Sequence, residues 1–156
     1  MKTFVVITDS HARSAKALQK LAPLFAENDY IIHLGDGSGD MRPVFLQYPE
    51  KTYICKGNCD FSYGEDEFIL EAEGVSVLCC HGHRQGVKGG LNRLAEYAKS
   101  KNCSVALYGH THIASIETVD GVRCINPGAL SSYSGPSYCY LVLHNGKATA
   151  TIVPIK

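Results

Sequence analysis

Near its start the chain reads TFVVITDSH, residues 3–11, in which a run of β-branched and aromatic residues leads into an acid and a histidine. Such a run is typical of a strand that is buried on both faces of a sheet. Residues 12–27 then carry apolar side chains at helical spacing, and two more buried strands are expected at 30–34 and 51–55. A strand–helix–strand order with short links predicts a parallel, right-handed βαβ unit.

The second half of the chain has a different pattern, in which paired strands are joined by tight turns. Asp120-Gly121 and Asn145-Gly146 each stand between two apolar runs, and both pairs favour two-residue hairpins because these residues tolerate positive φ. We expect strands at 68–72, 75–80, 105–108, 113–119, 122–125, 138–143 and 148–154, and a helix at about 88–101. The chain is therefore predicted to be an α/β protein with two sheets packed face to face and helices outside.

The composition favours one domain over residues 1–156, because a chain of 156 residues is too short for two ordinary domains. Its 15 basic and 15 acidic residues cancel, so we expect neither extended nucleic-acid binding nor attraction to a charged membrane. No signal peptide and no apolar run long enough to span a bilayer is visible. The seven cysteines are odd in number and include no C-x-x-C pair, which indicates reduced thiols in a cytoplasmic protein.

Five short polar clusters follow apolar strand runs. They are Asp9-Ser-His11, Gly35-Asp36, Gly57-Asn58-Cys59-Asp60, His81-Gly-His83 and Gly109-His110-Thr-His112. Ligands bind beyond the carboxyl ends of strands in open α/β sheets, so all five clusters could converge on one cleft. Carboxylate oxygens, imidazole nitrogens and an amide oxygen suit divalent metal ions. Taken singly, most of these clusters are better explained as turns, helix caps or hydrogen-bonded strand ends, but their order and number together favour a common site.

The order D-x-H, G-D, G-N, H and G-H-x-H resembles the calcineurin-like metallophosphoesterase superfamily, and the G-N-C-D variant resembles its compact bacterial and archaeal phosphodiesterase branch. The resemblance extends from Met1 to about Asn126-Pro127-Gly128. It implies a four-layer α/β/β/α sandwich with mixed sheets. It also implies a metal-dependent phosphoesterase, most simply a phosphodiesterase that hydrolyses small phosphodiesters or nucleotides.

The same resemblance implies two divalent metal ions and names their ligands. The first ion would be held by Asp9, His11, Asp36 and His112, and the second by Asp36, Asn58, His81 and His110. Asp36 would bridge the ions, and Asp36, Asn58 and His81 are expected to be catalytic. Two ions about 4 Å apart polarise phosphoryl oxygens and hold a bridging hydroxide for in-line attack at phosphorus. We expect Mn²⁺ first, with Mg²⁺, Fe²⁺, Ni²⁺ and Zn²⁺ as alternatives, because ligand type does not rank them.

Cys59 departs from the superfamily pattern, since many members have histidine at this position. A thiol with an ordinary pKa near 8.5 is a poor substitute for imidazolium, both as an acid and as a cation that binds phosphate. Hydrolysis is then expected to depend on the metals and to favour esters with good leaving groups. Asp60, which would orient that histidine, is left with a capping or turning role, and His83 is expected beside the substrate rather than on a metal.

A second hypothesis stays open, namely a scaffold of the same fold that has lost catalysis and acts in protein–protein interaction, as the retromer subunit of this fold does. Acceptable donors at every ligand position favour an enzyme, whereas Cys59 favours the scaffold. The natural substrate and the oligomeric state are left open, although paired C-terminal strands could present an edge to a second copy.

Overall fold

The computed structural model, which describes residues 1–61 and 63–156, contains two five-stranded sheets. The first has the order β10-β9-β1-β2-β3 and consists of β1 (Lys2–Ile7), β2 (Tyr30–His33), β3 (Thr52–Ile54), β9 (Ser137–His144) and β10 (Lys147–Pro154). Strands β1, β2 and β3 run parallel, as a βαβ unit requires, whereas β9 and β10 are antiparallel to their neighbours.

The second sheet has the order β4-β5-β6-β8-β7, with parallel strands in the middle and antiparallel strands at both edges. Its strands are β4 (Glu67–Ala72), β5 (Val75–Cys80), β6 (Val105–Leu107), β7 (Ser115–Val119) and β8 (Val122–Asn126). The predicted hairpins at Asp120-Gly121 and Asn145-Gly146 form, and Glu73-Gly74 makes a third between β4 and β5; both residues of each turn have positive φ. Because β5, β6 and β8 run parallel, their carboxyl ends lie at the same end of this sheet.

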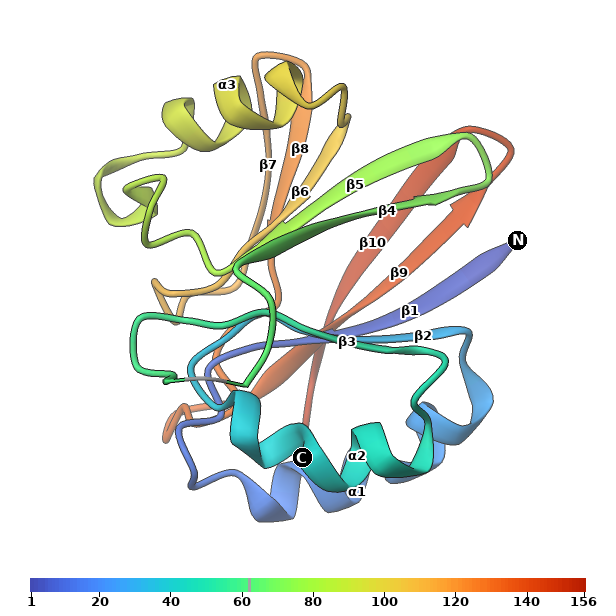
Figure 1. Cartoon of the computed structure of the whole chain (residues 1–156), viewed down its shortest axis with the longest axis vertical. Coiled ribbons are helices and arrows are strands. Elements are labelled where there is room, and N and C mark those ends of the chain that lie inside the picture. The colour runs from blue at the N-terminus through green and yellow to red at the C-terminus, as the bar shows by residue number, and fades with distance from the viewer. Residues whose placement is uncertain (62) are drawn as a thin grey trace.

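Helices cover the outer faces of both sheets. Figure 1 shows α1 (Ala15–Glu27) and α2 (Arg42–Gln47) beside the first sheet and α3 (Asn92–Ser100) beside the second. The predicted four-layer α/β/β/α sandwich with mixed sheets is therefore confirmed. Among the described residues, no helix has the length and apolar character needed to cross a membrane.

The helix boundaries differ from the sequence-based expectation for local reasons. Helix α1 begins three residues late because Ala12 has a φ of 57° and its N–H donates to Asp40. Helix α3 begins at Asn92 because a short 3₁₀ turn, Val87–Gly89, and Gly90, whose φ is 137°, come first. The six-residue α2 was not expected; a proline in its first turn is compatible with a helix start.

Three apolar clusters separate the four layers. The central cluster lies between the sheets and includes Phe4 and Val6 of β1, whereas Val5 and Ile7 of the same strand belong to the cluster under α1. Both faces of β1 are buried, which explains why its sequence is apolar without alternation. The third cluster packs α3 against the second sheet. Six of the seven cysteines are buried as free thiols, and Cys59 is exposed.

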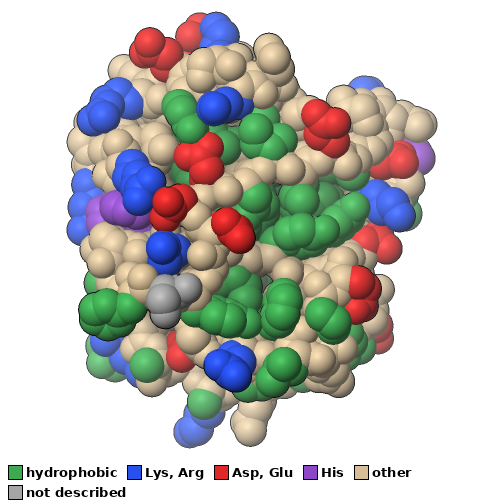
Figure 2. Space-filling model, in the orientation of Figure 1, with side chains coloured by type: hydrophobic (Ala, Val, Ile, Leu, Met, Phe, Trp, Pro, Cys, Tyr) green, Lys and Arg blue, Asp and Glu red, His purple; other side chains and the backbone are tan. Residues whose placement is uncertain are grey.

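The sandwich opens on one side, between the edge strands β3 and β4. Phe45, Tyr53 and Phe68 line a groove of about 640 Å³ there, and Figure 2 shows hydrophobic side chains gathered on this side of the molecule.

Candidate metal centre

The loops that carry the predicted donors follow neighbouring strand ends. Asp9 comes after β1, Asp36 after β2 and His81 after β5, and Figure 1 shows these strand ends meeting at one end of the sandwich. The loops also bind one another. The Asp9 N–H donates to Gly35 O at 3.0 Å, and the His110 N–H donates to Asp9 Oδ2 at 3.0 Å, which links the two sheets. Donors that are far apart in the sequence are thereby held in one place.

The first group of donors consists of Asp9, His11 and His112, whose donor atoms lie within 4.8 Å of one another. Asp9 Oδ1 is 3.3 Å from His11 Nε2 and 3.1 Å from His112 Nε2. The other oxygen, Oδ2, accepts hydrogen bonds from the Thr8 hydroxyl (2.7 Å) and the His110 N–H. These bonds fix the carboxylate so that Oδ1 faces the two imidazoles.

The second group consists of Asp36, His81 and His110, again with donor atoms within 4.8 Å of one another. His81 Nδ1 lies 2.8 Å from Leu34 O, which accepts the ring proton. In the neutral imidazole this bond leaves the lone pair on Nε2, the arrangement found for histidines that bind metals. His81 Nε2 is buried, and it makes no hydrogen bond within the described part of the chain although Asp36 Oδ2 is only 3.2 Å away.

Asp36 stands between the two groups. Its Oδ2 lies 3.2 Å from His81 Nε2 and 3.8 Å from His11 Nε2. Its Oδ1 accepts the Cys59 N–H at 2.8 Å, so the carboxylate cannot rotate freely. One oxygen thus faces a histidine of each group, which is the position that a bridging carboxylate needs.

The ionisation states of the donors are also suited to binding a cation. Burial disfavours ionisation of Asp36, but the adjacent His81 imidazole and the hydrogen bond from the Cys59 N–H outweigh it and hold the pKa of this carboxyl below its usual range. Burial opposes protonation of His81, yet Asp36 and Asp9 together raise the pKa of its imidazole. Burial, His81 and Lys88 lower the pKa of His110, so this imidazole is neutral near pH 7 and can act as a ligand.

The donor set fits a pair of divalent cations. Asp9 and Asp36 have exposed fractions of 0% and 3%, and buried carboxylates are normally paired or bound to metal. Asp9 Oδ1 and His81 Nε2 are both buried without a hydrogen bond among residues 1–61 and 63–156. Two unsatisfied atoms that face the same small region, on a mixed oxygen and nitrogen donor set, are what a divalent-metal site provides.

The backbone of these loops is strained where the donors lie. Asp9, His11, Asp36, His110 and His112 have φ values of 53°, 48°, 59°, 72° and 66°. A residue other than glycine in this region costs on the order of 1 kcal/mol or more, and such residues concentrate at functional sites. The strain orients the side chains toward the centre of the site.

Two predicted residues on the loop after β3 lie at the rim. Asn58 is exposed, and its amide donates to Cys59 Sγ at 3.6 Å, so its role as a ligand stays a prediction. The sulfur of Cys59 lies within 4.8 Å of donor atoms of His11 and Asp36, a proximity that sequence reasoning did not anticipate. Burial and the Asp36 carboxylate raise the pKa of this thiol, which is therefore uncharged near pH 7.

Asp60 has a larger role than the turn predicted for it. Its carboxylate accepts four backbone N–H groups, from Asp36 (2.7 Å), Gly37 (3.0 Å), Ser38 (3.2 Å) and Gly57 (2.8 Å). These bonds lower the pKa of Asp60 against the opposing effect of burial, and they join the loop after β2 to the loop after β3. The loops approach so closely that a Cβ at Gly57 would collide with Asp36 Oδ1.

Asn126 and His33 hold the remaining loops in place. The Asn126 amide donates to Gly109 O (3.1 Å) and to the Thr111 hydroxyl (3.0 Å). His33 is fully buried; its Nδ1 accepts the Gly35 N–H, and its Nε2 lies 2.9 Å from the Ser10 hydroxyl. Burial lowers the pKa of His33 to about 4, so the ring is neutral. Both residues position the donors rather than contact the centre of the site.

His83 and Asp40 lie next to the donor groups. The His83 ring centroid is 5.3 Å from that of His81, and the predicted position of His83 beside the substrate stays a prediction. Asp40 Oδ2 accepts the Ser10 hydroxyl (2.6 Å) and the Ala12 N–H (3.0 Å), which fixes the loop that carries His11.

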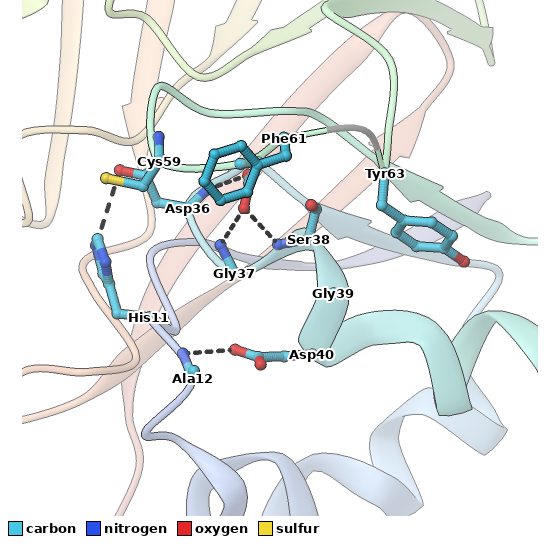
Figure 3. Close-up of a pocket in the computed structure, with 11 residues that line it drawn as sticks. His11, Ala12, Asp36, Gly37, Ser38, Gly39, Asp40, Cys59, Phe61 and Tyr63 are labelled. Atoms are coloured by element: carbon cyan, nitrogen blue, oxygen red, sulfur yellow. Dashed lines mark hydrogen bonds and ion pairs between the residues drawn. The ribbon is translucent and has the colours of Figure 1, made fainter.

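A cavity of about 460 Å³ opens beside the donors. Its wall includes His11, Asp36, Asp40, Cys59, Phe61 and Tyr63, and Figure 3 shows these side chains around the opening. A ligand bound there could reach both Asp36 and the aromatic side chains.

Comparison with known proteins adds an independent finding. The model of the calcineurin-like phosphoesterase superfamily domain matches residues 1–147. The chain is 36% identical over 150 residues to YsnB of Bacillus subtilis, described as a probable metallophosphoesterase, and the match covers 93% of this chain and 86% of that protein. It is 39% identical over 69 residues to the phosphodiesterase MJ0936 of Methanocaldococcus jannaschii, covering 44% of this chain and 38% of that protein.

Among solved structures, a mutant of Vps29 from Entamoeba histolytica has a TM-score of 0.78 with this chain. The match covers 99% of both chains at 20% sequence identity, so it concerns the fold alone.

Proposed function

Because the chain belongs to the calcineurin-like phosphoesterase superfamily, we propose that it is a divalent-metal phosphodiesterase that hydrolyses small phosphodiesters. We place the reaction at the candidate metal centre, by which we mean Asp9, His11, Asp36, His81, His110 and His112. The observation that carries the proposal is the place of Asp36 between two histidine groups, next to a buried Asp9 Oδ1 and a buried His81 Nε2 that lack hydrogen bonds within the described structure. The phosphodiesterase MJ0936 supports the choice of a diester.

When bound, two divalent ions would polarise the phosphoryl oxygens and lower the pKa of the attacking water. The chain's own contribution is to hold the donors rigidly, through the hydrogen bonds on Asp9 Oδ2, Asp36 Oδ1 and His81 Nδ1. Two carboxylates do not neutralise two divalent ions, so the site retains positive charge for an anionic ester. The uncharged thiol of Cys59 supplies no cation for the leaving oxygen, which favours esters with good leaving groups.

The test is hydrolysis of bis(4-nitrophenyl) phosphate by protein stripped of metal and then supplied with Mn²⁺, Mg²⁺, Fe²⁺, Ni²⁺ or Zn²⁺ in turn. We expect turnover only after a divalent ion is added, with Mn²⁺ the most effective, and loss of that turnover in Asp36→Ala. Leu46→Ala, an exposed residue on α2 outside the centre, is the control and should keep wild-type activity. Absence of metal-dependent turnover, or full turnover in Asp36→Ala, would contradict the proposal.

Two observations bear on the alternative, a scaffold without catalysis. Cys59 stands exposed where many members of the superfamily have histidine, and the fold is shared with Vps29. Metal analysis tests whether the site is eroded, because an eroded site would retain no stoichiometric divalent ion after dialysis against metal-free buffer, and the turnover assay then separates the two functions. Retention of about two ions per chain, lost in Asp36→Ala, would exclude an eroded site.

A further inference from the structure

We propose that the ester carries a flat aromatic ring, such as a nucleobase, which stacks on Phe61 in the cavity beside the candidate metal centre. This inference rests on the proposed function for the position of the phosphate. It names the class of substrate, which the metal centre by itself leaves open.

The exposure of Phe61 is the first observation. Its side chain is 97% exposed, whereas Phe4 in the core is 0% exposed. A phenylalanine exposed to this degree contributes nothing to the packing of its own chain and is open to contact from a ligand. Bases of every kind stack on exposed aromatic rings.

The position of Phe61 is the second observation. Phe61 lines the same cavity as His11 and Asp36, so one small molecule can contact the ring and the metal centre together. In Figure 3 the ring lies between Cys59 and Tyr63 at the edge of the cavity. Tyr63 is held by an edge-to-face contact with Phe45, at 6.4 Å between ring centroids, and it forms a second, fixed aromatic wall. The cavity volume of about 460 Å³ is within the usual range for small-ligand sites.

The charges around the cavity exclude a second phosphate. None of the described residues that line the cavity is Lys or Arg, and Asp40 and Asp60 both contribute carboxylates. The glycine-rich loop 35–39 looks suited to bind an anion, but the N–H groups of Asp36, Gly37 and Ser38 all donate to Asp60. The cavity therefore suits a neutral group, and its aromatic walls suit a flat one.

The test compares two phosphates that differ only by a ring. Adenosine 5′-monophosphate and ribose 5-phosphate are titrated into the Mn²⁺-loaded protein by calorimetry, and the ratio of the two Kd values is the readout. We expect wild type to bind the nucleotide about tenfold more tightly, the effect of one stacked base. In Phe61→Ala the ratio should fall to near one.

Three further variants sharpen the result. Phe61→Leu keeps an apolar side chain of similar size without a ring, and its ratio should also fall, whereas Phe61→Tyr should retain the wild-type ratio. Leu46→Ala removes an exposed apolar side chain that does not line the cavity, and its ratio should stay that of wild type. A wild-type ratio near one, or a tenfold ratio that survives in Phe61→Ala, would overturn the inference.

The binding readout separates this inference from the proposed function. If the wild type prefers the nucleotide through Phe61 but hydrolyses no phosphodiester, the stacking site stands and the proposed function fails. If the wild type hydrolyses bis(4-nitrophenyl) phosphate but binds the two phosphates equally, the function stands and the stacking site fails.

Discussion

Two regions of the molecule use the same strained backbone conformation for different ends. At the hairpin turns, Glu73, Asp120 and Asn145 have φ values of 54°, 50° and 48°, and each is followed by a glycine with positive φ. At the candidate metal centre, Asp9 and Asp36 adopt nearly the same φ, 53° and 59°. Asp120 and Asn145 are exposed and Glu73 is half-buried, whereas Asp9 and Asp36 are buried.

The difference shows what the strain accomplishes in each region. In a hairpin, positive φ reverses the chain, and the side chain that bears it faces solvent. At the metal centre, positive φ decides where a carboxylate points, and the surrounding hydrogen bonds hold it there. The same type of substitution should therefore affect activity and stability very differently in the two regions.

The largest contrast is expected between Asp9→Asn and Asp120→Asn. Asp9 Oδ1 faces His11 and His112, and loss of its charge should lower kcat/KM on bis(4-nitrophenyl) phosphate by on the order of 10³, because a ligand to the ions is weakened. Asp120→Asn removes only an exposed pair with Lys99 and should leave kcat/KM unchanged. Steady-state kinetics of both variants at saturating Mn²⁺ measures the two kcat/KM values. Equal activities would show that the Asp9 carboxylate has no catalytic role.

The next effect is on stability and concerns Asp60. Asp60→Ala leaves four backbone N–H groups without their acceptor and should lower the free energy of unfolding by about 3 kcal/mol, measured by urea denaturation. The matched control is Asp66→Ala, whose exposed carboxylate pairs with Lys56 and Arg84 and which should change that energy by less than about 1 kcal/mol. If both substitutions lower the free energy of unfolding by equally small amounts, Asp60 does not hold the two loops together.

Alanine substitution of one glycine in each region distinguishes the effect of a steric collision from that of backbone strain. Gly57→Ala places a Cβ against Asp36 and should lower the free energy of unfolding by about 2 kcal/mol and weaken Mn²⁺ binding. Gly121→Ala meets no atom, but its φ of 81° disfavours alanine, so it should cost about 1 kcal/mol and leave Mn²⁺ affinity unchanged. Calorimetric titration with Mn²⁺ measures the Mn²⁺ affinity of both variants. A Gly121→Ala protein with weakened Mn²⁺ binding would contradict the separation of the two regions.

The elements of the fold were predictable because their causes are local. Continuous apolar runs mark strands buried on both faces, and Asp-Gly and Asn-Gly mark the hairpins. The start of α1 was not predictable, because Ala12 is kept out of the helix by Asp40, which is 28 residues away. Local pattern carries no information about such a partner.

The convergence of the candidate donors was predictable for related reasons, and their roles as metal ligands stay predictions. The donors are chemically distinctive side chains at strand ends, so Asp9, Asp36 and His81 could be brought together from the sequence. The role of Asp60 could not be found that way, because its partners are backbone N–H groups that nearly every residue has. Only the folded chain shows which of them converge on one carboxylate.

The smallest expected effect lies at the hairpin end and depends on pH. Glu73 accepts the Asn145 N–H, and its carboxylate is 3.1 Å from the N-terminal ammonium group; these two partners lower the pKa of Glu73. A lowered pKa means that the stabilising effect is fully present above the unfolded value, about 4.3 for glutamate, and is lost as the pH falls through the lower folded value. Wild type should therefore exceed Glu73→Gln in Tm slightly at pH 7, and the two Tm values should converge as the pH falls below 4.

Salt provides the control for this last effect. The N-terminal ammonium group is exposed and the Glu73 carboxylate is partly exposed, so 1 M NaCl should remove most of the difference at pH 7. A difference that persists at low pH or in high salt would mean that Glu73 acts through packing. Metal-dependent turnover should be the same in Glu73→Gln and wild type at every pH, because the hairpin turn and the metal centre lie at opposite ends of β5. A change in turnover would show that the two regions are coupled.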